Sequence, residues 1–398
     1  MNPRPRVALV GGPDVDARVP LMRELGARFE FTAYGSDPRA GPKIADAGFA
    51  FRHYPLSRRV APWTDVRSFW QLRAAFLQTQ PDVVHAFDTK PGVFGCLAAR
   101  SAGVPVVLAT ITGLGALYAQ HDLRTRGLRK AYEMLQRLAC DRADITIFQN
   151  HDDERQLVAA GVATAGKTAV ILGSGVDTRR FAPRGADASA RARVRAELGI
   201  PLDAVTATMI ARVTRSKGVL EFMAAARTVR AATPNARFLL IGPDDRESRD
   251  RLSQVELEEL RRLVVWPGSR DDVPDLLAAS DLFVLPTAYR EGIPRVLLEA
   301  AASGLPLVTT DSPGCNEACV HGHNGMLVRI GDADALAAAI AALATDASLR
   351  QRFAAASRAR AETMFDLGVI SGQMAAAWER LLSQKVGNQA TRAGSSST

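Results

Sequence analysis

The stretch DLFVLPTAYREGIPRVLLEAAA, from Asp281 to Ala302, carries the pattern that decides the fold. Its residues Leu282–Leu285 are apolar and rich in β-formers, as in a strand buried on both faces, and its second half is a helix-forming pattern. A buried strand followed by a helix is the repeating unit of a parallel sheet covered by helices. The stretch therefore predicts an α/β fold.

The same strand-then-helix pattern recurs along the whole chain. In the first half the predicted strands are Arg6–Val10, Phe31–Tyr34, Phe49–Tyr54, Asp82–Ala86, Val104–Ala109 and Ile145–Phe148. After Pro183 the series begins again with Val205–Ile210, Phe238–Ile241, Leu263–Trp266, Leu282–Leu285, Leu307–Thr309 and Gly325–Val328. Two such series predict two doubly wound, Rossmann-like domains that face each other across a cleft.

The turn-rich segment Asp177–Gly185 separates the two series. We expect an N-terminal domain over residues 1–180 and a C-terminal domain over residues 181–365. Residues 366–386 are predicted to form a helix that crosses back to the N-terminal domain. Residues 387–398 have no apolar pattern and are predicted to be a disordered tail.

Composition favours a cytoplasmic protein that does not cross a membrane. The chain has 398 residues, of which 47% are hydrophobic, and neither its N-terminus nor any internal segment resembles a signal peptide or a spanning helix. Four cysteines are too few and too scattered for a disulfide framework, which fits a reducing compartment. We expect buried thiols at Cys96, Cys140, Cys315 and Cys319.

The positive charge is concentrated in the first half of the chain. Residues 1–180 carry 24 Lys and Arg against 17 Asp and Glu, whereas residues 181–398 carry 26 against 25. Two segments there, Arg58–Trp70 and Arg124–Tyr132, mix bases with aromatic or apolar residues. Such mixtures suit an anionic membrane surface, although helices with solvated basic outer faces are the alternative. Nucleic acid is a poor candidate partner, because no binding motif accompanies the charge.

Residues suited to binding a phosphorylated sugar gather where the strand Leu282–Leu285 meets the following helix. Gly292 lets a ligand approach the backbone, Pro294 suits the first helical position, and the N–H groups of a helix start favour a diphosphate. Glu291 and Glu299 are eight residues apart, about 12 Å along a helix, which is roughly the hexose-to-ribose distance in a nucleotide sugar. Their carboxylates could accept from sugar hydroxyls, or they could be ordinary surface acids.

Two further segments follow predicted strand ends. In ARVTRSKG, from Ala211 to Gly218, Arg212 and Lys217 could stabilise the charge on a leaving diphosphate, or they could be two solvated bases. In the segment after Leu263–Trp266, Arg270 could contact the nucleobase of a nucleotide, whereas Asp272 suits a helix cap.

Residues 200–330 resemble the donor domain of the group 1 glycosyltransferases, family 4 of the sugar-enzyme classification, which have the GT-B fold. The matching segments are, in order, ARVTRSKG, LLIG, GSRDDVPDLLAASDLFVLPT, EGIPRVLLE and TTDSPGCNEACVHGHNGMLV. The resemblance implies that Arg212 and Lys217 bind the diphosphate, that Glu291 contacts the donor sugar, and that Glu299 contacts the ribose. We take Glu291, Arg212 and Lys217 as the catalytic set. The predicted donor-binding residues are Gly12, Arg270, Gly292, Ile293, Pro294, Arg295 and Glu299.

Two loops of the first half resemble a subgroup of bacterial enzymes that glycosylate undecaprenyl-diphosphate-linked sugars. They are HAFDTKPGVFG, from His85 to Gly95, and TITGLGALY, from Thr110 to Tyr118. Many family members carry a His in the second loop, where this chain has Thr112 or Gly113, so no catalytic His is carried over. The predicted acceptor-binding residues are His85, Lys90, Thr112 and Gly113, with Lys90 on an acceptor phosphate. Alternatively, His85 is a hydrogen-bonded strand-end residue and Lys90 a solvated lysine.

The resemblance implies a retaining transfer of a hexose or N-acetylhexosamine from a nucleotide diphosphate sugar, with UDP favoured, to a lipid-linked saccharide of a surface polysaccharide or glycan. It implies no cofactor and no obligatory metal, since Arg212, Lys217 and a helix start can replace a cation. It also implies a place on the inner face of the membrane. A nucleotide-sugar epimerase or hydrolase of the same fold and a catalytically silent binding protein are the alternatives.

Overall fold

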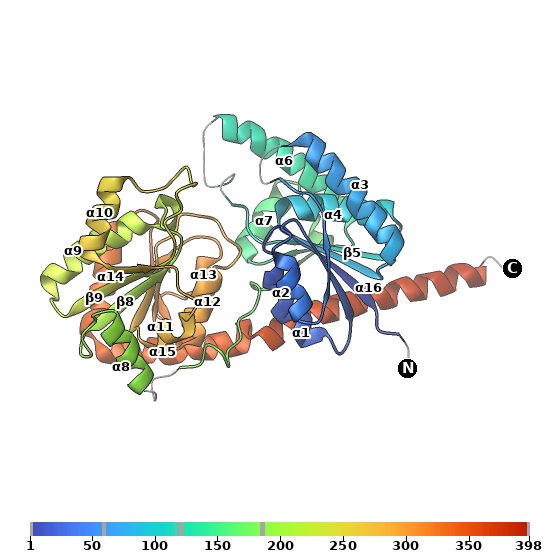
Figure 1. Ribbon diagram of the computed structural model, residues 1–398. Coiled ribbons are helices and arrows are strands. Elements are labelled where there is room, and N and C mark those ends of the chain that lie inside the picture. The colour runs from blue at the N-terminus through green and yellow to red at the C-terminus, as the bar shows by residue number, and fades with distance from the viewer. Residues whose placement is uncertain (1–2, 58–60, 116–117, 119–122, 184–187, 396–398) are drawn as a thin grey trace. The chain divides into compact units, whose positions relative to one another are not determined.

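The computed structural model describes residues 3–57, 61–115, 118, 123–183 and 188–395. The chain forms two compact units, one comprising Met1–Gly173 with Leu367–Thr398 and the other Ser174–Asp366. Each has its own parallel sheet with helices on both faces (Figure 1). Both units therefore have the predicted doubly wound α/β architecture.

The first unit is built on seven parallel strands in the order β3-β2-β1-β4-β5-β6-β7. They are β1 (Arg6–Val10), β2 (Glu30–Gly35), β3 (Ala50–His53), β4 (Val83–Phe87), β5 (Val106–Ile111), β6 (Ile145–Phe148) and β7 (Thr168–Val170). The six predicted strands are confirmed, with ends shifted by one or two residues. Strand β7 was not predicted, because three residues at a sheet edge are too few to show a period.

Helices cover both faces of this sheet (Figure 1). On one face lie α1 (Val19–Leu25), α2 (Ala40–Asp46) and α16 (Leu367–Ser395), and on the other α3 (Pro62–Thr79), α4 (Thr89–Ser101) and α6 (Leu123–Arg142). Helix α7 (His151–Ala159) follows β6. Successive strand residues alternate between the two cores: Leu9 packs in the cluster that contains Trp378, and Val10 in the cluster that contains Phe76.

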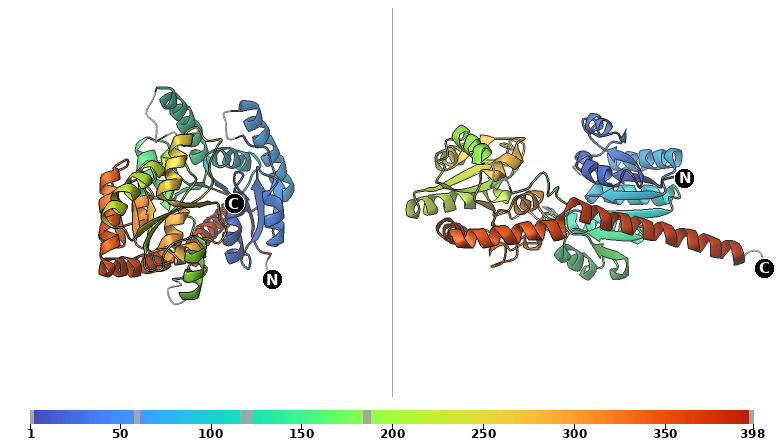
Figure 2. Two further views of the ribbon diagram at one scale, coloured as in Figure 1. Left: turned by 60° about the vertical axis from the view of Figure 1, so that its left-hand side comes forward. Right: turned by 90° about the horizontal axis from the view of Figure 1, so that it is seen from below.

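Helix α16 runs lengthwise along the sheet of the first unit (Figure 2). It continues to Ser395, so the structure differs from the expected disordered tail after residue 386. The reason is cooperativity: once the packed part of α16 has nucleated, a tail with few helix breakers can extend it at little cost.

The second unit repeats this topology with six parallel strands in the order β10-β9-β8-β11-β12-β13. They are β8 (Val205–Ile210), β9 (Ala236–Ile241), β10 (Val265–Gly268), β11 (Leu282–Leu285), β12 (Leu307–Thr310) and β13 (Gly325–Val328). All six were predicted, again with small shifts at the ends.

The helices of the second unit also form two layers. Helices α9 (Val219–Ala232), α10 (Gln254–Leu263) and α14 (Ala333–Thr345) pack together, as do α8 (Ala188–Glu197) and α11 (Val273–Ala278) on the other face (Figure 1). The remaining helices are α12 (Arg295–Ala302), α13 (Cys315–Ala318) and α15 (Ala347–Arg360), which runs into a π-helical turn at Ala361–Phe365. The four cysteines are buried free thiols, as expected.

The unit boundary lies before the predicted residue 180, because the segment after Gly173 is bonded to the end of the second unit. The N–H of Val176 donates to the carbonyl of Phe365 at 2.9 Å, and Thr178 Oγ1 donates to Asp366 at 2.5 Å. The two segments at which the chain passes between the units are therefore joined to each other.

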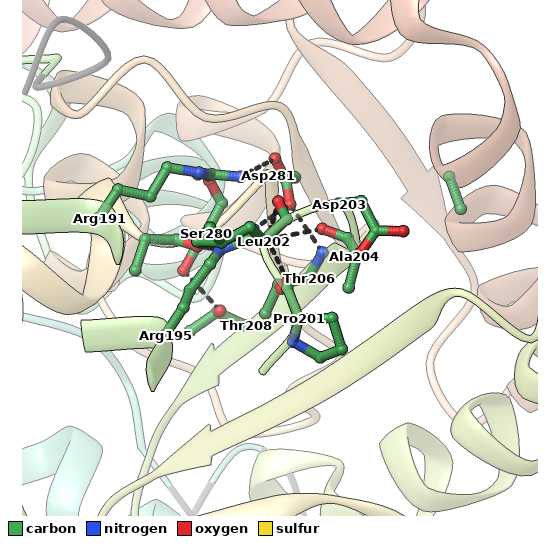
Figure 3. A network of polar contacts seen from close by, with 12 residues as sticks. Arg191, Arg195, Pro201, Leu202, Asp203, Ala204, Thr206, Thr208, Ser280 and Asp281 are labelled. Atoms are coloured by element: carbon green, nitrogen blue, oxygen red, sulfur yellow. Dashed lines mark hydrogen bonds and ion pairs between the residues drawn. The ribbon is translucent and has the colours of Figure 1, made fainter. Parts of the chain in front are cut away.

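A buried arginine holds the amino ends of β8 and β11 (Figure 3). Arg195 of α8 is 0% exposed and donates to Asp281 at 2.7 Å. It also donates to four backbone carbonyls, those of Ala279, Pro201, Leu202 and Ala204. This network lies at the amino ends of two central strands, opposite the carboxyl ends at which such folds bind ligands, so it supports the fold rather than a ligand site.

None of the helices in the described part of the chain is both long and apolar enough to span a membrane.

Candidate functional site

Three loops that follow β8, β11 and β12 are tied together by hydrogen bonds. The carbonyl of Ser216 accepts from the N–H of Ala288 at 2.9 Å and from Thr287 Oγ1 at 3.1 Å. Thr310 Oγ1 in turn donates to the carbonyl of Thr287 at 2.6 Å. The carboxyl ends of three adjacent strands thus present their loops as one connected surface.

Two glycines with positive φ allow this close packing. Gly218, at φ 80°, lies so near Pro286 that a Cβ would overlap the Pro286 carbonyl. Gly314, at φ 83°, is likewise pressed against the backbone of Gly292. Only glycine fits both the backbone conformation and the space. The loop that contains Glu291 and Gly292 is therefore held from two sides.

Lys217 and Glu291, two of the predicted catalytic residues, are in direct contact. Lys217 Nζ donates to Glu291 Oε1, and its side chain is only 13% exposed. The same ammonium lies 5.3 Å from the centre of the Tyr289 ring. The structure thus places a cation from the loop after β8 beside a carboxylate of the loop between β11 and α12.

Arg212 follows β8 at the same end of the sheet. It pairs with Asp245 at 2.5 Å, and its side chain is 54% exposed. Exposed ion pairs contribute little to stability, so this guanidinium can change partners at small cost.

Glu299 lies inside α12 and is largely shielded from solvent. Its side chain is 15% exposed, and Arg295 approaches it to 3.8 Å one turn away. Burial raises the pKa of Glu299, and the charges of Arg295 and Arg180 oppose the rise in that pKa. Hydrogen bonds donated by hydroxyl groups would stabilise the ionised form of such a shielded carboxylate.

The start of α12 differs slightly from its predicted form. Pro294 is the N-cap and Arg295 the first helical residue, so Glu291 lies in a loop and the helical estimate of 12 Å applies to only part of the interval up to Glu299. Ile293 is 4% exposed, which leaves its backbone rather than its side chain for a ligand.

Arg270 is held by two carboxylates. It pairs with Asp272 at 2.7 Å and with Glu197 of α8. Asp272 is the N-cap of α11, but its carboxylate is engaged by Arg270 instead of capping the helix. These contacts connect α8 to the start of α11, and a role of Arg270 toward the donor stays a prediction.

His85 is a core residue of the first unit, which corrects its prediction as an acceptor ligand. Its side chain is 0% exposed, and its ring stacks on Phe87 at 4.2 Å. Nδ1 accepts from Trp378 Nε1 at 3.1 Å, so Nε2 carries the proton and donates to Thr110 Oγ1 at 2.7 Å. Burial, with Arg18 nearby, lowers the pKa of His85 to about 3. A neutral ring with both nitrogens engaged cannot contact a ligand.

The other predicted acceptor residues lie at the carboxyl ends of β4 and β5. Thr112 Oγ1 donates to Asp88 at 2.5 Å, Gly113 has φ 130°, and Lys90 pairs with Asp65 at 2.8 Å. Lys90 is thus paired with a carboxylate rather than simply solvated, and its role toward a phosphate stays a prediction.

Asp88 is a candidate residue that the sequence reasoning missed. It is the N-cap of α4 and has φ 70°, a conformation that costs a residue with a side chain about 1–3 kcal/mol. Such strain is found disproportionately at functional sites, but a backbone angle leaves no sign in the sequence.

Gly12 lies in the buried turn after β1. Its carbonyl accepts from the N–H of Ser36 at 3.3 Å, and Tyr54 donates to the carbonyl of the preceding Gly11 at 2.8 Å. The turn is thereby fixed to the ends of β2 and β3. Its predicted contact with a donor remains a prediction.

In the described part of the chain, no three His, Cys, Asp or Glu side chains gather as metal ligands would.

Two family models match the chain, one in each unit. Residues 204–346 match the model described as glycosyl transferases group 1, and residues 19–173 match the glycosyl transferase 4-like domain.

Two curated relatives cover most of the chain. It is 26% identical over 305 residues, 76% of each protein, to the UDP-Gal:alpha-D-GlcNAc-diphosphoundecaprenol alpha-1,3-galactosyltransferase of Escherichia coli. It is 28% identical over 369 residues to the N,N'-diacetylbacillosaminyl-diphospho-undecaprenol alpha-1,3-N-acetylgalactosaminyltransferase of Campylobacter jejuni, covering 92% of this chain and 95% of the relative.

Solved structures share the fold. Anabaena Alr3699/HepE in complex with UDP superposes with a TM-score of 0.78 at 20% identity, over 94% of this chain and all of that one. Sucrose-phosphate synthase from Thermosynechococcus elongatus gives a TM-score of 0.79 at 22% identity, over 96% of this chain and 100% of that one. With a matching family model in each unit and this common architecture, the chain consists of a glycosyl transferase 4-like domain and a glycosyl transferases group 1 domain and has the GT-B fold.

Proposed function

We propose that this glycosyltransferase moves a hexose or N-acetylhexosamine from a UDP-sugar to a lipid-linked saccharide, with retention of anomeric configuration, in the synthesis of a surface polysaccharide or glycan. The observation that carries the proposal is the contact between Lys217 and Glu291 beside the start of α12. A cation that suits a diphosphate lies there next to a carboxylate that can accept from sugar hydroxyls.

The charges at this site suit a leaving diphosphate. As the bond from the sugar C1 to the diphosphate breaks, negative charge grows on the departing oxygen, where Lys217 and Arg212 can neutralise it. The acceptor hydroxyl then bonds to C1 from the side of the leaving group, and its proton passes to the departing phosphate oxygen. Glu291 holds the hydroxyls of the sugar and Glu299 those of the ribose. We propose that this set works without an obligatory metal, so a chelator should leave turnover unchanged.

The relatives support the substrate classes. Both curated relatives are named for a diphosphoundecaprenol-linked sugar as acceptor, and the names specify galactosyl and N-acetylgalactosaminyl transfer. Solved structures of HepE contain UDP and UDP-glucose.

A transfer assay tests the proposal. The protein is incubated with UDP-hexoses or UDP-N-acetylhexosamines and with undecaprenyl-diphosphate-linked N-acetylglucosamine, and the product is analysed by NMR. We expect an extended lipid-linked glycan whose new linkage keeps the configuration of the donor. An inverted linkage would contradict retention. Release of free or epimerised sugar with or without acceptor would instead identify the hydrolase or epimerase alternative.

We further propose that the face formed by α3 and α6 rests on the anionic inner leaflet of the membrane. Both helices pack against α4 on the same side of the sheet (Figure 1). On α3, Trp63 is 89% and Trp70 57% exposed, and Val66 lies between them on the same stripe. Such indole rings suit the depth of lipid headgroups. The predicted Arg58 and Arg59 lie outside the described residues.

Helix α6 adds apolar and basic side chains to this face. Its exposed apolar residues are Leu128, Met134, Leu135 and Leu138. Exposed bases at Arg126, Lys130 and Arg137 accompany them and can meet lipid phosphates.

Vesicle flotation tests this surface. The wild-type protein should float with vesicles of phosphatidylglycerol and phosphatidylethanolamine and less with phosphatidylcholine alone. The double variant Trp63→Ser/Trp70→Ser should lose most of this binding, whereas Val255→Ser, which removes an exposed apolar residue of the second unit, should not. Equal flotation of the two variants would contradict the proposal.

A further inference from the structure

The ring of Tyr289 lies beside the ammonium group of Lys217. Lys217 Nζ is 5.3 Å from the centre of the ring, which is within the roughly 6 Å over which the face of an aromatic ring attracts a cation. The side chain of Lys217 is only 13% exposed, and such contacts are stronger where the cation is shielded from water. Tyr289 is not among the residues that the sequence predicted for the donor site.

Resting on the proposed function, we propose that Tyr289 is a positioning residue for the transfer reaction. Its ring holds Lys217 in place while the ammonium group exchanges its present partner, Glu291, for the diphosphate of the donor.

The exchange requires a contact that persists when Glu291 turns to the hydroxyls of the sugar. A second carboxylate could hold the ammonium of Lys217, but it would also cancel the charge that the leaving group needs. The face of the Tyr289 ring attracts the ammonium without neutralising it and without occupying its N–H donors. A neutral aromatic ring therefore suits this position better than an acid does.

Hydrogen bonds fix the backbone on both sides of the ring. The N–H of Tyr289 donates to Thr287 Oγ1 at 3.1 Å, and the carbonyl of Tyr289 accepts from the N–H of Glu291 at 3.1 Å. Thr287 is 0% exposed, and its Oγ1 donates to the carbonyl of Ser216, the residue before Lys217. The two segments that carry the ring and the ammonium are thus joined close to the contact. A contact that is preorganised in this way costs little when the donor binds.

The ring should affect the diphosphate rather than the nucleoside. A lysine side chain is long and flexible, so Lys217 without the ring would spend more of its time away from the departing oxygen. Both the affinity for a diphosphate and the rate of its departure depend on where the ammonium lies. Binding of uridine, which carries no phosphate, does not depend on this ammonium.

Titration of the full-length protein with UDP and with uridine tests the inference. Tyr289→Leu removes the ring, whereas Tyr289→Phe removes only the hydroxyl group and is the matched control. We expect Tyr289→Leu to weaken UDP binding about tenfold and Tyr289→Phe to weaken it less than about threefold. Uridine should bind the wild type and both variants equally, which also shows that the variants are folded. Equal UDP affinities of the wild type and Tyr289→Leu, or equal losses in the two variants, would overturn the inference.

Fluorinated phenylalanine at position 289 separates the attraction of the ring from its shape. Ring fluorines withdraw negative charge from the face of the ring, which is the source of its attraction for a cation. Affinity for UDP should fall stepwise as fluorines are added, with Tyr289→Phe as the reference. An affinity that stays constant along this series would show that the ring only fills space and would contradict the inference.

The proposed function and this inference can fail separately. A wild-type protein that binds UDP but transfers no sugar would contradict the proposed function, and the UDP affinities of the variants would still decide the role of Tyr289. If sugar is transferred, Tyr289→Leu should lower kcat about tenfold at saturating substrates and leave the KM for acceptor unchanged. An unchanged kcat with a raised KM for acceptor would place Tyr289 on the acceptor and overturn the inference.

Discussion

Lys217 and Glu291 neutralise each other at the carboxyl ends of the strands of the six-stranded sheet. A diphosphate offers Lys217 a more highly charged partner than one carboxylate does, and sugar hydroxyls offer Glu291 new donors. Donor binding can therefore exchange one set of contacts for another without leaving a shielded charge unpaired, which would cost several kcal/mol.

Replacing Lys217 by alanine should lower kcat by about 10²-fold or more, because it removes a preorganised donor to the leaving group. The matched control is Arg215→Ala, which removes a base from the same turn that is paired with Glu256 at 2.7 Å. Steady-state kinetics with saturating donor and acceptor measure both. Equal losses in the two variants would show that loop charge in general, rather than Lys217, supports turnover.

The buried carboxyl of Glu299 should make stability depend on pH. Its pKa is raised in the folded state from the ordinary value of 4.5, chiefly by burial. A raised pKa means that the folded state holds the proton more tightly, so its contribution to the unfolding free energy is present below pH 4.5 and is lost as pH rises through the folded pKa. Urea unfolding should therefore show wild type losing stability relative to Glu299→Gln over that window. A constant difference between the two would contradict the assignment.

At this scale, the sequence identifies residues by type and spacing but not by environment. Glu291, Arg212 and Lys217 could be chosen because they follow predicted strands. The burial of His85 could not be predicted, because its hydrogen-bond partner Trp378 lies far away along the chain. The positive φ of Asp88 also depends on surrounding structure that the sequence does not display.

The loop between β11 and α12 owes its shape to neighbouring elements. The loop after β8 is hydrogen-bonded to it through Ser216, and the loop after β12 packs on it through Gly314. The helix start that is proposed to bind a diphosphate is therefore supported by two other strand ends.

Gly314→Ala should weaken donor binding, whereas a glycine substitution of similar backbone cost elsewhere should not. A methyl group there would overlap the carbonyl of Gly292 and displace the loop. Gly322→Ala is the control, because Gly322 also has a positive φ, 74°, but its Cβ would meet nothing within 4 Å. Each variant bears a backbone cost of about 1–2 kcal/mol. Calorimetry should show weakened UDP binding in Gly314→Ala alone; equal UDP affinities would contradict this account of the loop.

Elements were predictable where their residues form long apolar runs. All twelve predicted strands are present, and central strands such as β4, β5 and β11 are largely apolar because they are buried on both faces. Short or context-dependent features were not predictable. Strand β7 has three residues, and the extension of α16 to Ser395 depends on a helix nucleated by packing upstream.

At the scale of the whole molecule, the chain leaves the first unit at Gly173 and returns to it at Leu367. Helix α16 completes the core of that unit through Trp378, whose ring packs edge-on against Phe29 at 5.2 Å. The first unit is therefore built from both ends of the chain, and it depends on residues that follow the whole second unit.

Trp378→Ala should destabilise the protein by about 3–5 kcal/mol, as expected for a buried tryptophan. The side chain is 0% exposed and donates to His85, so the variant leaves both a cavity and an unpaired ring nitrogen. Trp70→Ala, which removes a tryptophan that is 57% exposed, should change the unfolding free energy by about 0.5 kcal/mol or less. Chemical denaturation compares the unfolding free energies of the two variants. A loss in Trp378→Ala as small as that in Trp70→Ala would show that α16 contributes little to the core.

The most direct test of the central claim is a crystal structure of the protein with UDP. We predict that the diphosphate lies at the start of α12 within hydrogen-bond distance of Lys217 Nζ, that Lys217 has left Glu291, and that the ribose hydroxyls donate to Glu299. A diphosphate bound elsewhere, with Lys217 still bonded to Glu291, would contradict the account.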